Sequence, residues 1–178
     1  MPTLKFELPS QRDQTVSNLG RWDELLADPV LAKIEGRIET DRHGQVIISP
    51  PRAAQHGRFQ FRIGHLLRDK MPSGEVLTEC PISTADGVKA ADVAWASDAT
   101  MSELGNRACF PRAPEICVEV LSPRNTPREI EEKLALYFDA RAGEVWTCDE
   151  SGAMRFYASP KGAVLDRSGL CLGFPSRI

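Results

Sequence analysis

Two acidic residues and one lysine occupy positions that packing alone does not explain. Asp92 lies within the small and apolar residues 90–96, and Glu119 lies within the apolar residues 116–121. Lys133 follows in a segment with strong helix signals. Carboxylate oxygens are the ligands that Mg²⁺ prefers, and a lysine can neutralise charge that develops on a phosphate. Together the three could cleave a phosphodiester with a metal, provided the fold brings them into one site.

Glu119 interrupts a run typical of a strand that is buried on both faces. Because side chains alternate along a strand, Glu119 shares a face with Cys117 and Leu121. A buried carboxylate requires a cation, a hydrogen-bond donor or a raised pKa. The alternative is that the end of the strand is exposed and Glu119 reaches water.

Asp92 shares its strand face with Ala90, Ala94 and Ala96. These methyl groups leave room beside the acid for something bulky. A metal-bound substrate would fill that room, and so would a packed helix.

Lys133 belongs to the best-delimited helix of the chain. Thr126 and Glu129 form a Thr-x-x-Glu capping box, and Pro127 suits the first helical position. Gly143 is a suitable C-terminal stop. The packing face comprises Ile130, Leu134, Tyr137 and Phe138. Lys133 lies at the margin of this face, where it either reaches the acids or is simply solvated.

His56 and Glu35 are weaker candidates. His56 lies on the apolar stripe of a helix predicted over 53–70, where a core histidine bonded to a carbonyl is the common case. Its place near the helix N-terminus leaves a minor catalytic role open, with the ring facing the acids. Glu35 precedes Gly36 near the first hairpin, and we expect it to shape or neighbour the site.

The elements needed to position these residues alternate between strands and helices. We expect one domain over residues 21–178, preceded by a poorly ordered arm, residues 1–20. The predicted elements are a short helix at 22–27, a hairpin over 33–49, the helix 53–70, strands at 75–80 and 88–96, a helical turn at 99–105, a strand at 116–121, the capped helix, and strands at 144–148, 154–158 and 163–166. This order predicts an α/β fold, with a mixed central sheet flanked by helices and peripheral β-hairpins.

Composition excludes several classes of protein. The 178 residues, 42% of them hydrophobic, suffice for one buried core, and no apolar run approaches the roughly 18 residues of a membrane span. The five cysteines form no Cys-x-x-Cys pair, which fits a reducing cytoplasm. No Gly-x-Ser-x-Gly elbow or Gly-rich phosphate loop occurs, and Cys117 is predicted to be buried rather than nucleophilic. The net charge of −3 argues against a protein that coats nucleic acid.

The order of short motifs resembles the Uma-two family of the restriction-endonuclease-like PD-(D/E)XK superfamily over about residues 30 to 160. The matching pieces are Ile34-Glu35-Gly36, Ser49-Pro50-Pro51, His56, Ala91-Asp92-Val93, Val118-Glu119-Val120-Leu121-Ser122-Pro123, Glu132-Lys133, Tyr137 and Glu144-Val145-Trp146. The resemblance implies a restriction-endonuclease-like core and Mg²⁺-dependent nuclease activity. The family's aspartate and glutamate match Asp92 and Glu119. Its lysine, displaced onto the following helix, matches Lys133, whereas the superfamily's usual lysine position holds Leu121.

The chain departs from the family at three positions. Ala91 stands where proline is usual before the aspartate, and Glu129 stands for an aspartate while still serving the capping box. Arg141 replaces a glycine at the end of the helix, and with Gly143 two residues further on we expect a longer helix.

These observations predict a metal-dependent DNA endonuclease. Asp92 and Glu119 are the expected ligands of Mg²⁺, with Mn²⁺ as a substitute, and Lys133 is their electrostatic partner. A homodimer is the simplest way to cut both strands of a duplex, and no membrane partner is expected. The alternative is a protein that keeps the nuclease fold as a non-catalytic binding or assembly module. RNA or a small phosphodiester also remains open as a substrate.

Overall fold

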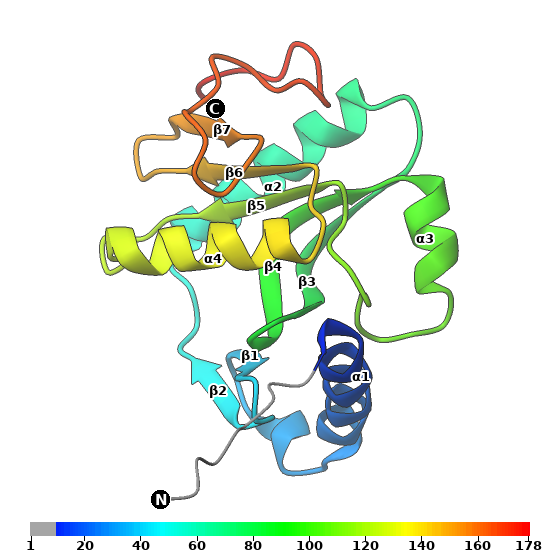
Figure 1. Cartoon of the computed structure of the whole chain (residues 1–178). Helices are drawn as coiled ribbons and strands as arrows, with labels where there is room; N and C mark the ends of the chain where they lie inside the picture. Colours follow the sequence, from blue (N-terminus) through cyan, green and yellow to red (C-terminus); the bar gives the residue numbers. More distant parts are fainter. Residues whose placement is uncertain (1–9) are drawn as a thin grey trace, which may run out of the picture.

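The computed structural model of the chain describes residues 10–178 and forms an α/β structure (Figure 1). Its elements are α1 (Gln11–Ala27), a 3₁₀ turn η1 (Leu31–Lys33), β1 (Arg37–Thr40), β2 (Val46–Ser49), α2 (Ala54–Lys70), β3 (Glu75–Thr84), β4 (Gly87–Ala96), α3 (Asp98–Leu104), β5 (Ile116–Val120), α4 (Pro127–Asp139), β6 (Glu144–Cys148) and β7 (Met154–Tyr157).

The main sheet has five strands in the order β3-β4-β5-β6-β7. Strands β5 and β6 are parallel and joined by α4, and the other neighbours are antiparallel. Helix α4 crosses one face of the sheet and α2 lies on the other (Figure 1). The α2 side is closed by apolar residues such as Phe59, Ile63 and Val118, and the α4 side by residues such as Leu134 and Cys117. This architecture confirms the predicted mixed α/β fold.

The β1–β2 hairpin forms a separate two-stranded sheet fastened to β4. The Val88 amide donates to Thr40 Oγ1 at 2.8 Å, and the Ala90 amide donates to Glu39 Oε1 at 3.0 Å. These bonds use backbone donors of β4 that no neighbouring strand engages. They attach β1 to β4 at Val88 and Ala90, close to Asp92 in the same strand.

Helix α1 differs from the expected arm over residues 1–20. Residues 11–20 belong to this helix, and the Ser10 side chain caps it by accepting from the Asp13 amide. Few of its residues are buried, so its apolar pattern is too weak to reveal its length. Asn18 holds it to β3 by donating to Ser83 Oγ and to the Thr84 carbonyl, each at 2.9 Å. The remainder of the predicted arm, residues 1–9, lies outside the described residues.

The capping box predicted for α4 is confirmed. Thr126 Oγ1 accepts from the Glu129 amide at 3.2 Å, and Glu129 Oε2 accepts from the Thr126 amide at 2.7 Å. The expectation of a longer helix is wrong, because α4 ends at Asp139. Arg141 adopts a φ of 76°, the left-handed conformation that favours glycine, which accounts for a glycine preference there.

Two smaller expectations have different outcomes. The outer strand over 163–166 is reduced to one isolated bridge between Leu165 and Phe156. Cys117 is fully buried as predicted, and burial raises the pKa of its thiol, so it is no accessible nucleophile. Among residues 10–178, no helix combines the length and apolar character that crossing a membrane requires.

Glu115 fastens α3 to the start of β5 and gives a pH-dependent prediction. Burial alone would raise its pKa, but donation from Ser97 and Thr100, both at 2.6 Å, lowers it. The stabilisation is therefore complete above the unfolded pKa of about 4.3 and is lost as pH falls through the lower folded pKa. Glu115→Gln should reduce the free energy of unfolding by about 1 kcal/mol at pH 7, since the carboxylate is partly exposed.

The measurement is urea denaturation from pH 7 to pH 3. The difference between Glu115→Gln and wild type should shrink towards pH 3, whereas the exposed Glu150→Gln control should match wild type throughout. A difference that grows on acidification would contradict the assignment.

Candidate functional site

The strands β4 and β5 part at the site. Their ladder runs from Trp95↔Ile116 to Val93↔Val118 and ends there, one step before Asp92 and Glu119 would face each other. In place of a ladder bond, the Val120 amide donates to Asp92 Oδ2 at 2.7 Å. The two predicted acids therefore lie at the same opening in the sheet.

Asp92 has no exposed surface and is compensated by two side chains from outside its strand. Arg37 Nη1 donates to its Oδ1 at 2.8 Å, and His56 Nε2, from the first turn of α2, lies 3.2 Å from the same oxygen. Burial opposes ionisation, but the nearby His56 and the charge of Arg37 outweigh it and lower the pKa of Asp92. Asp92 is consequently an anion at neutral pH.

Glu119 faces α4. The buried Tyr137 hydroxyl donates to its Oε1 at 2.6 Å, and Lys133 Nζ donates to its Oε2 at 3.1 Å. Burial raises the pKa of Glu119; the Lys133 charge opposes this rise and the Asp92 charge adds to it. The neighbouring acids thus differ in environment, and Asp92 is the stronger acid.

Lys133 joins Glu119 to a third acid. Its Nζ also lies 3.3 Å from Glu39 Oε1, and 25% of its side chain is exposed. Burial would lower the pKa of Lys133, but the charges of Glu119 and Glu39 raise it, so the group remains an ammonium ion. The rotation of α4 therefore turns Lys133 towards the acids rather than into solvent.

Three further charged residues of the site were absent from the sequence-based set. Arg37 Nε lies 3.2 Å from Glu79 Oε2 and 3.6 Å from Glu39 Oε1. Arg37 and Glu39 alternate with Ile38 in β1, a pattern that assigns them to solvent; only the attachment of the hairpin to β4 turns them inward. Glu79 adopts a left-handed φ of 49°, a conformation that the sequence pattern does not predict.

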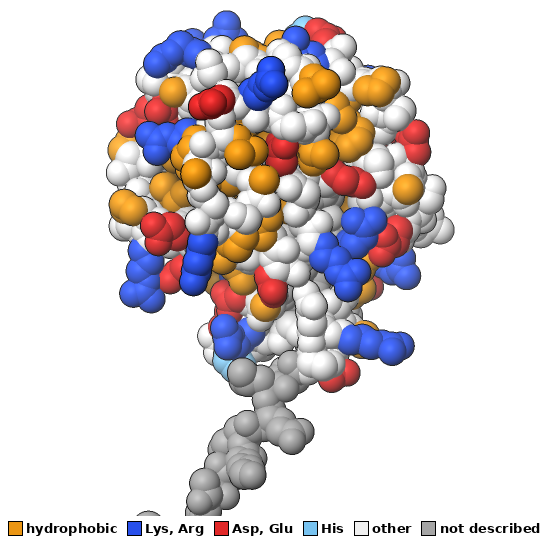
Figure 2. Space-filling model, turned by 45° about the horizontal axis from the view of Figure 1, so that its top comes forward, with side chains coloured by type: hydrophobic (Ala, Val, Ile, Leu, Met, Phe, Trp, Pro, Cys, Tyr) orange, Lys and Arg blue, Asp and Glu red, His pale blue; other side chains and the backbone are white. Residues whose placement is uncertain are grey.

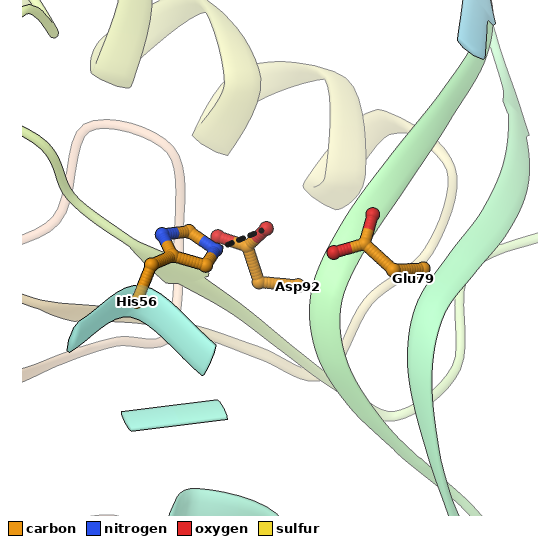
Figure 3. A group of neighbouring side chains, drawn as sticks. All are labelled: His56, Glu79 and Asp92. Atoms are coloured by element: carbon orange, nitrogen blue, oxygen red, sulfur yellow. Dashed lines mark ion pairs between the residues drawn. The ribbon is translucent and has the colours of Figure 1, made fainter. Parts of the chain in front are cut away.

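One group of side chains could hold a metal ion. Ligand atoms of His56, Glu79 and Asp92 lie within 4.8 Å of one another, with the Glu79 carboxylate directed towards Asp92 (Figure 3). An imidazole with two carboxylates suits divalent transition metals as well as harder ions. His56 Nε2 is buried and makes no well-formed hydrogen bond, although it lies 3.2 Å from Asp92 Oδ1. The residues fit a divalent ion, although the Arg37 guanidinium already contacts both acids.

The sequence-predicted residues are thus partly assembled. Asp92, Glu119 and Lys133 share one ion-pair network, but Glu119 is not a member of the metal-capable group within the described residues. That Asp92 and Glu119 share an ion stays a prediction. His56 contacts an acid rather than a carbonyl, as its minor alternative required. Glu35 is exposed and forms no side-chain hydrogen bond or ion pair within residues 10–178.

A cavity of about 290 Å³ opens beside Glu119 and Lys133. The acidic residues in its wall outnumber the basic ones, which are Arg52, Lys89 and Lys133. Over the face shown in Figure 2, acidic and basic side chains are interspersed rather than gathered by sign. A phosphate entering this cavity would meet Lys133 and an excess of negative charge, so further cationic charge is needed to hold it.

Comparison with known proteins identifies the family. The Uma2 profile, described as "Putative restriction endonuclease", matches residues 22–167, so the chain belongs to this family, the Uma-two family named above. A crystal structure from Anabaena variabilis, described as "a putative nuclease belonging to DUF820", has a TM-score of 0.64 at 18% identity, covering 80% of this chain and 81% of that one. At this identity the likeness shows a shared fold. A search of curated proteins found no match.

Tyr137→Phe tests the support of Glu119. The change removes one donor from a buried carboxylate while keeping the ring, so it should lower the free energy of unfolding by about 1–3 kcal/mol. Chemical denaturation at pH 7 measures the effect. Tyr157→Phe, on β7 and without a hydroxyl hydrogen bond among the described residues, should change stability by less than about 0.5 kcal/mol. Equal effects of the two substitutions would refute the role of the Tyr137 hydroxyl.

Proposed function

We propose that this protein is a divalent-metal-dependent nuclease that hydrolyses phosphodiester bonds in DNA. The observation that carries the proposal is the direct contact of Lys133 with Glu119 in the wall of a cavity, with the buried, ionised Asp92 on the neighbouring strand. The family description and the nuclease-fold neighbour support the same class of reaction.

Each residue has a distinct task in this proposal. Lys133 presents an ammonium group at the cavity and neutralises charge on the reacting phosphate. Glu119 holds that ammonium in place and is itself held by Tyr137. Asp92 provides a permanent negative charge where the strands part. His56 contacts Asp92 from α2 and orients its carboxylate.

The metal would be held by Asp92, with Glu119 on the α4 side and His56 and Glu79 on the α2 side as further donors. When bound, a divalent cation polarises the phosphate and lowers the pKa of a bound water. Mg²⁺ suits the carboxylate oxygens, and Mn²⁺ accepts the imidazole more readily. Of these donors Glu119 lines the cavity, so it would link the ion to the space where the phosphate binds.

One observation favours the non-catalytic alternative. Both oxygens of Asp92 and both oxygens of Glu119 already have partners within the chain. A centre neutralised in this way could serve as the stable core of a binding or assembly module. Cleavage of DNA distinguishes the two functions.

The test is cleavage of supercoiled plasmid DNA in the presence of about 10 mM Mg²⁺ or Mn²⁺, a concentration chosen to fill a weak site. Wild type should nick or linearise the plasmid, and Asp92→Asn, Glu119→Gln and Lys133→Met should each reduce the rate by at least about a hundredfold. Removal of the metal with EDTA should abolish cleavage.

The matched control is Glu131→Gln, an exposed acid on the same helix that should cleave like wild type. Cleavage that survives Glu119→Gln would show that the activity arises elsewhere. No cleavage by wild type with either metal, on duplex or single-stranded DNA, would favour the non-catalytic module.

A further inference from the structure

Arg37 is the most deeply buried cation of the site. Only 5% of its side chain is exposed, and its guanidinium lies among Asp92, Glu79 and Glu39. These contacts place it on the same Asp92 Oδ1 that His56 Nε2 approaches. Arg37 therefore contacts two of the three metal-capable ligands and shares the Asp92 oxygen that the third approaches.

The guanidinium is poorly satisfied in this position. A guanidinium carries five N–H donors, and only Nη1 makes a well-formed hydrogen bond, to Asp92. Its Nε and Nη2 are buried without a hydrogen-bond partner, as is His56 Nε2. Arg37 Nε and His56 Nε2 nevertheless lie 3.2 Å from Glu79 Oε2 and Asp92 Oδ1, so these polar groups are crowded around the acids without well-formed hydrogen bonds.

Four acids form ion pairs with the two cations of the site. Arg37 contacts Glu39, Glu79 and Asp92, and Lys133 contacts Glu39 and Glu119. Four carboxyl groups thus face two cations, Arg37 and Lys133. The acids outnumber these cations, which favours a further cation, but a divalent ion cannot sit against the same oxygen as a guanidinium without strong repulsion.

We propose that Arg37 is an internal occupant of the metal centre, and that a divalent ion binds Asp92, Glu79 and His56 only when the guanidinium leaves. The proposal rests on the metal requirement of the proposed nuclease and identifies what limits metal affinity. Arg37 thereby sets the metal concentration at which the site fills. Without metal, the same residue keeps a buried aspartate compensated.

The experiment is calorimetric titration of Mn²⁺ into the full chain. Arg37→Met keeps the approximate length of the side chain and removes its charge. It should bind Mn²⁺ at least about tenfold more tightly than wild type. Mn²⁺ should also restore thermal stability that the metal-free variant has lost. Arg112→Met, which removes an arginine paired with Glu103 away from the site, should bind as wild type does.

The gain must depend on the proposed ligands. Adding Asp92→Asn to Arg37→Met should abolish the tighter binding. Unchanged or weaker binding by Arg37→Met would overturn the proposal, as would tight binding that survives Asp92→Asn or the absence of binding by both wild type and Arg37→Met.

If Arg37→Met fails to fold, a measurement on wild type tests the proposal instead. The Arg37 Nε–H resonance, assigned through Arg37→Lys, should shift and exchange faster with water as the diamagnetic Mg²⁺ is added. An unmoved resonance under saturating Mg²⁺ would overturn the proposal. The plasmid assay distinguishes failure of this proposal from failure of the proposed function. Tighter Mn²⁺ binding by Arg37→Met without DNA cleavage by wild type would contradict only the nuclease function. DNA cleavage by wild type with unchanged Mn²⁺ affinity of Arg37→Met would contradict only the role of Arg37.

Discussion

The site depends on the compensation of one carboxylate, Asp92, which has no exposed surface. An uncompensated charge at this depth would cost several kcal/mol, so the surrounding elements must supply donors and cations. The parting of β4 and β5 frees the Val120 amide, the attached hairpin brings Arg37, and the first turn of α2 brings His56. The opening in the sheet, the attachment of the hairpin to β4 and the placement of α2 thus meet at a single charged group.

Helix α4 solves the corresponding problem for Glu119. The capping box at Thr126 fixes where the helix begins, and the parallel pairing of β5 with β6 obliges the helix to cross the sheet. Tyr137 and Lys133, one turn apart, then both reach Glu119. A single helix therefore supplies a neutral donor from the core and a cation from the edge of the cavity.

The sequence was informative where a residue departed from the local pattern or where a known motif occurred. An acid inside the apolar strand at 116–121 revealed Glu119, and the capping box located the helix of Lys133. Only the C-terminal part of α1 was predicted, at 22–27, because few residues of the helix are buried. Arg37 and Glu39 were missed because strand alternation assigned them to solvent. Their inward direction follows from how one small sheet attaches to another, and the left-handed backbone of Glu79 follows from tertiary constraint. Neither leaves a mark in residue order.

The two cations differ in a way that bears on their roles. Lys133 is partly exposed, lines the cavity and shares its charge between Glu119 and Glu39, so an incoming phosphate can compete for it without unfolding anything. Arg37 is buried, and removing it from Asp92 exposes a charge that only another cation can compensate. Under the proposed function the substrate anion reaches Lys133, and under the proposed exchange the metal displaces Arg37. The different exposures of Arg37 and Lys133 thus distinguish two cations within one network of ion pairs.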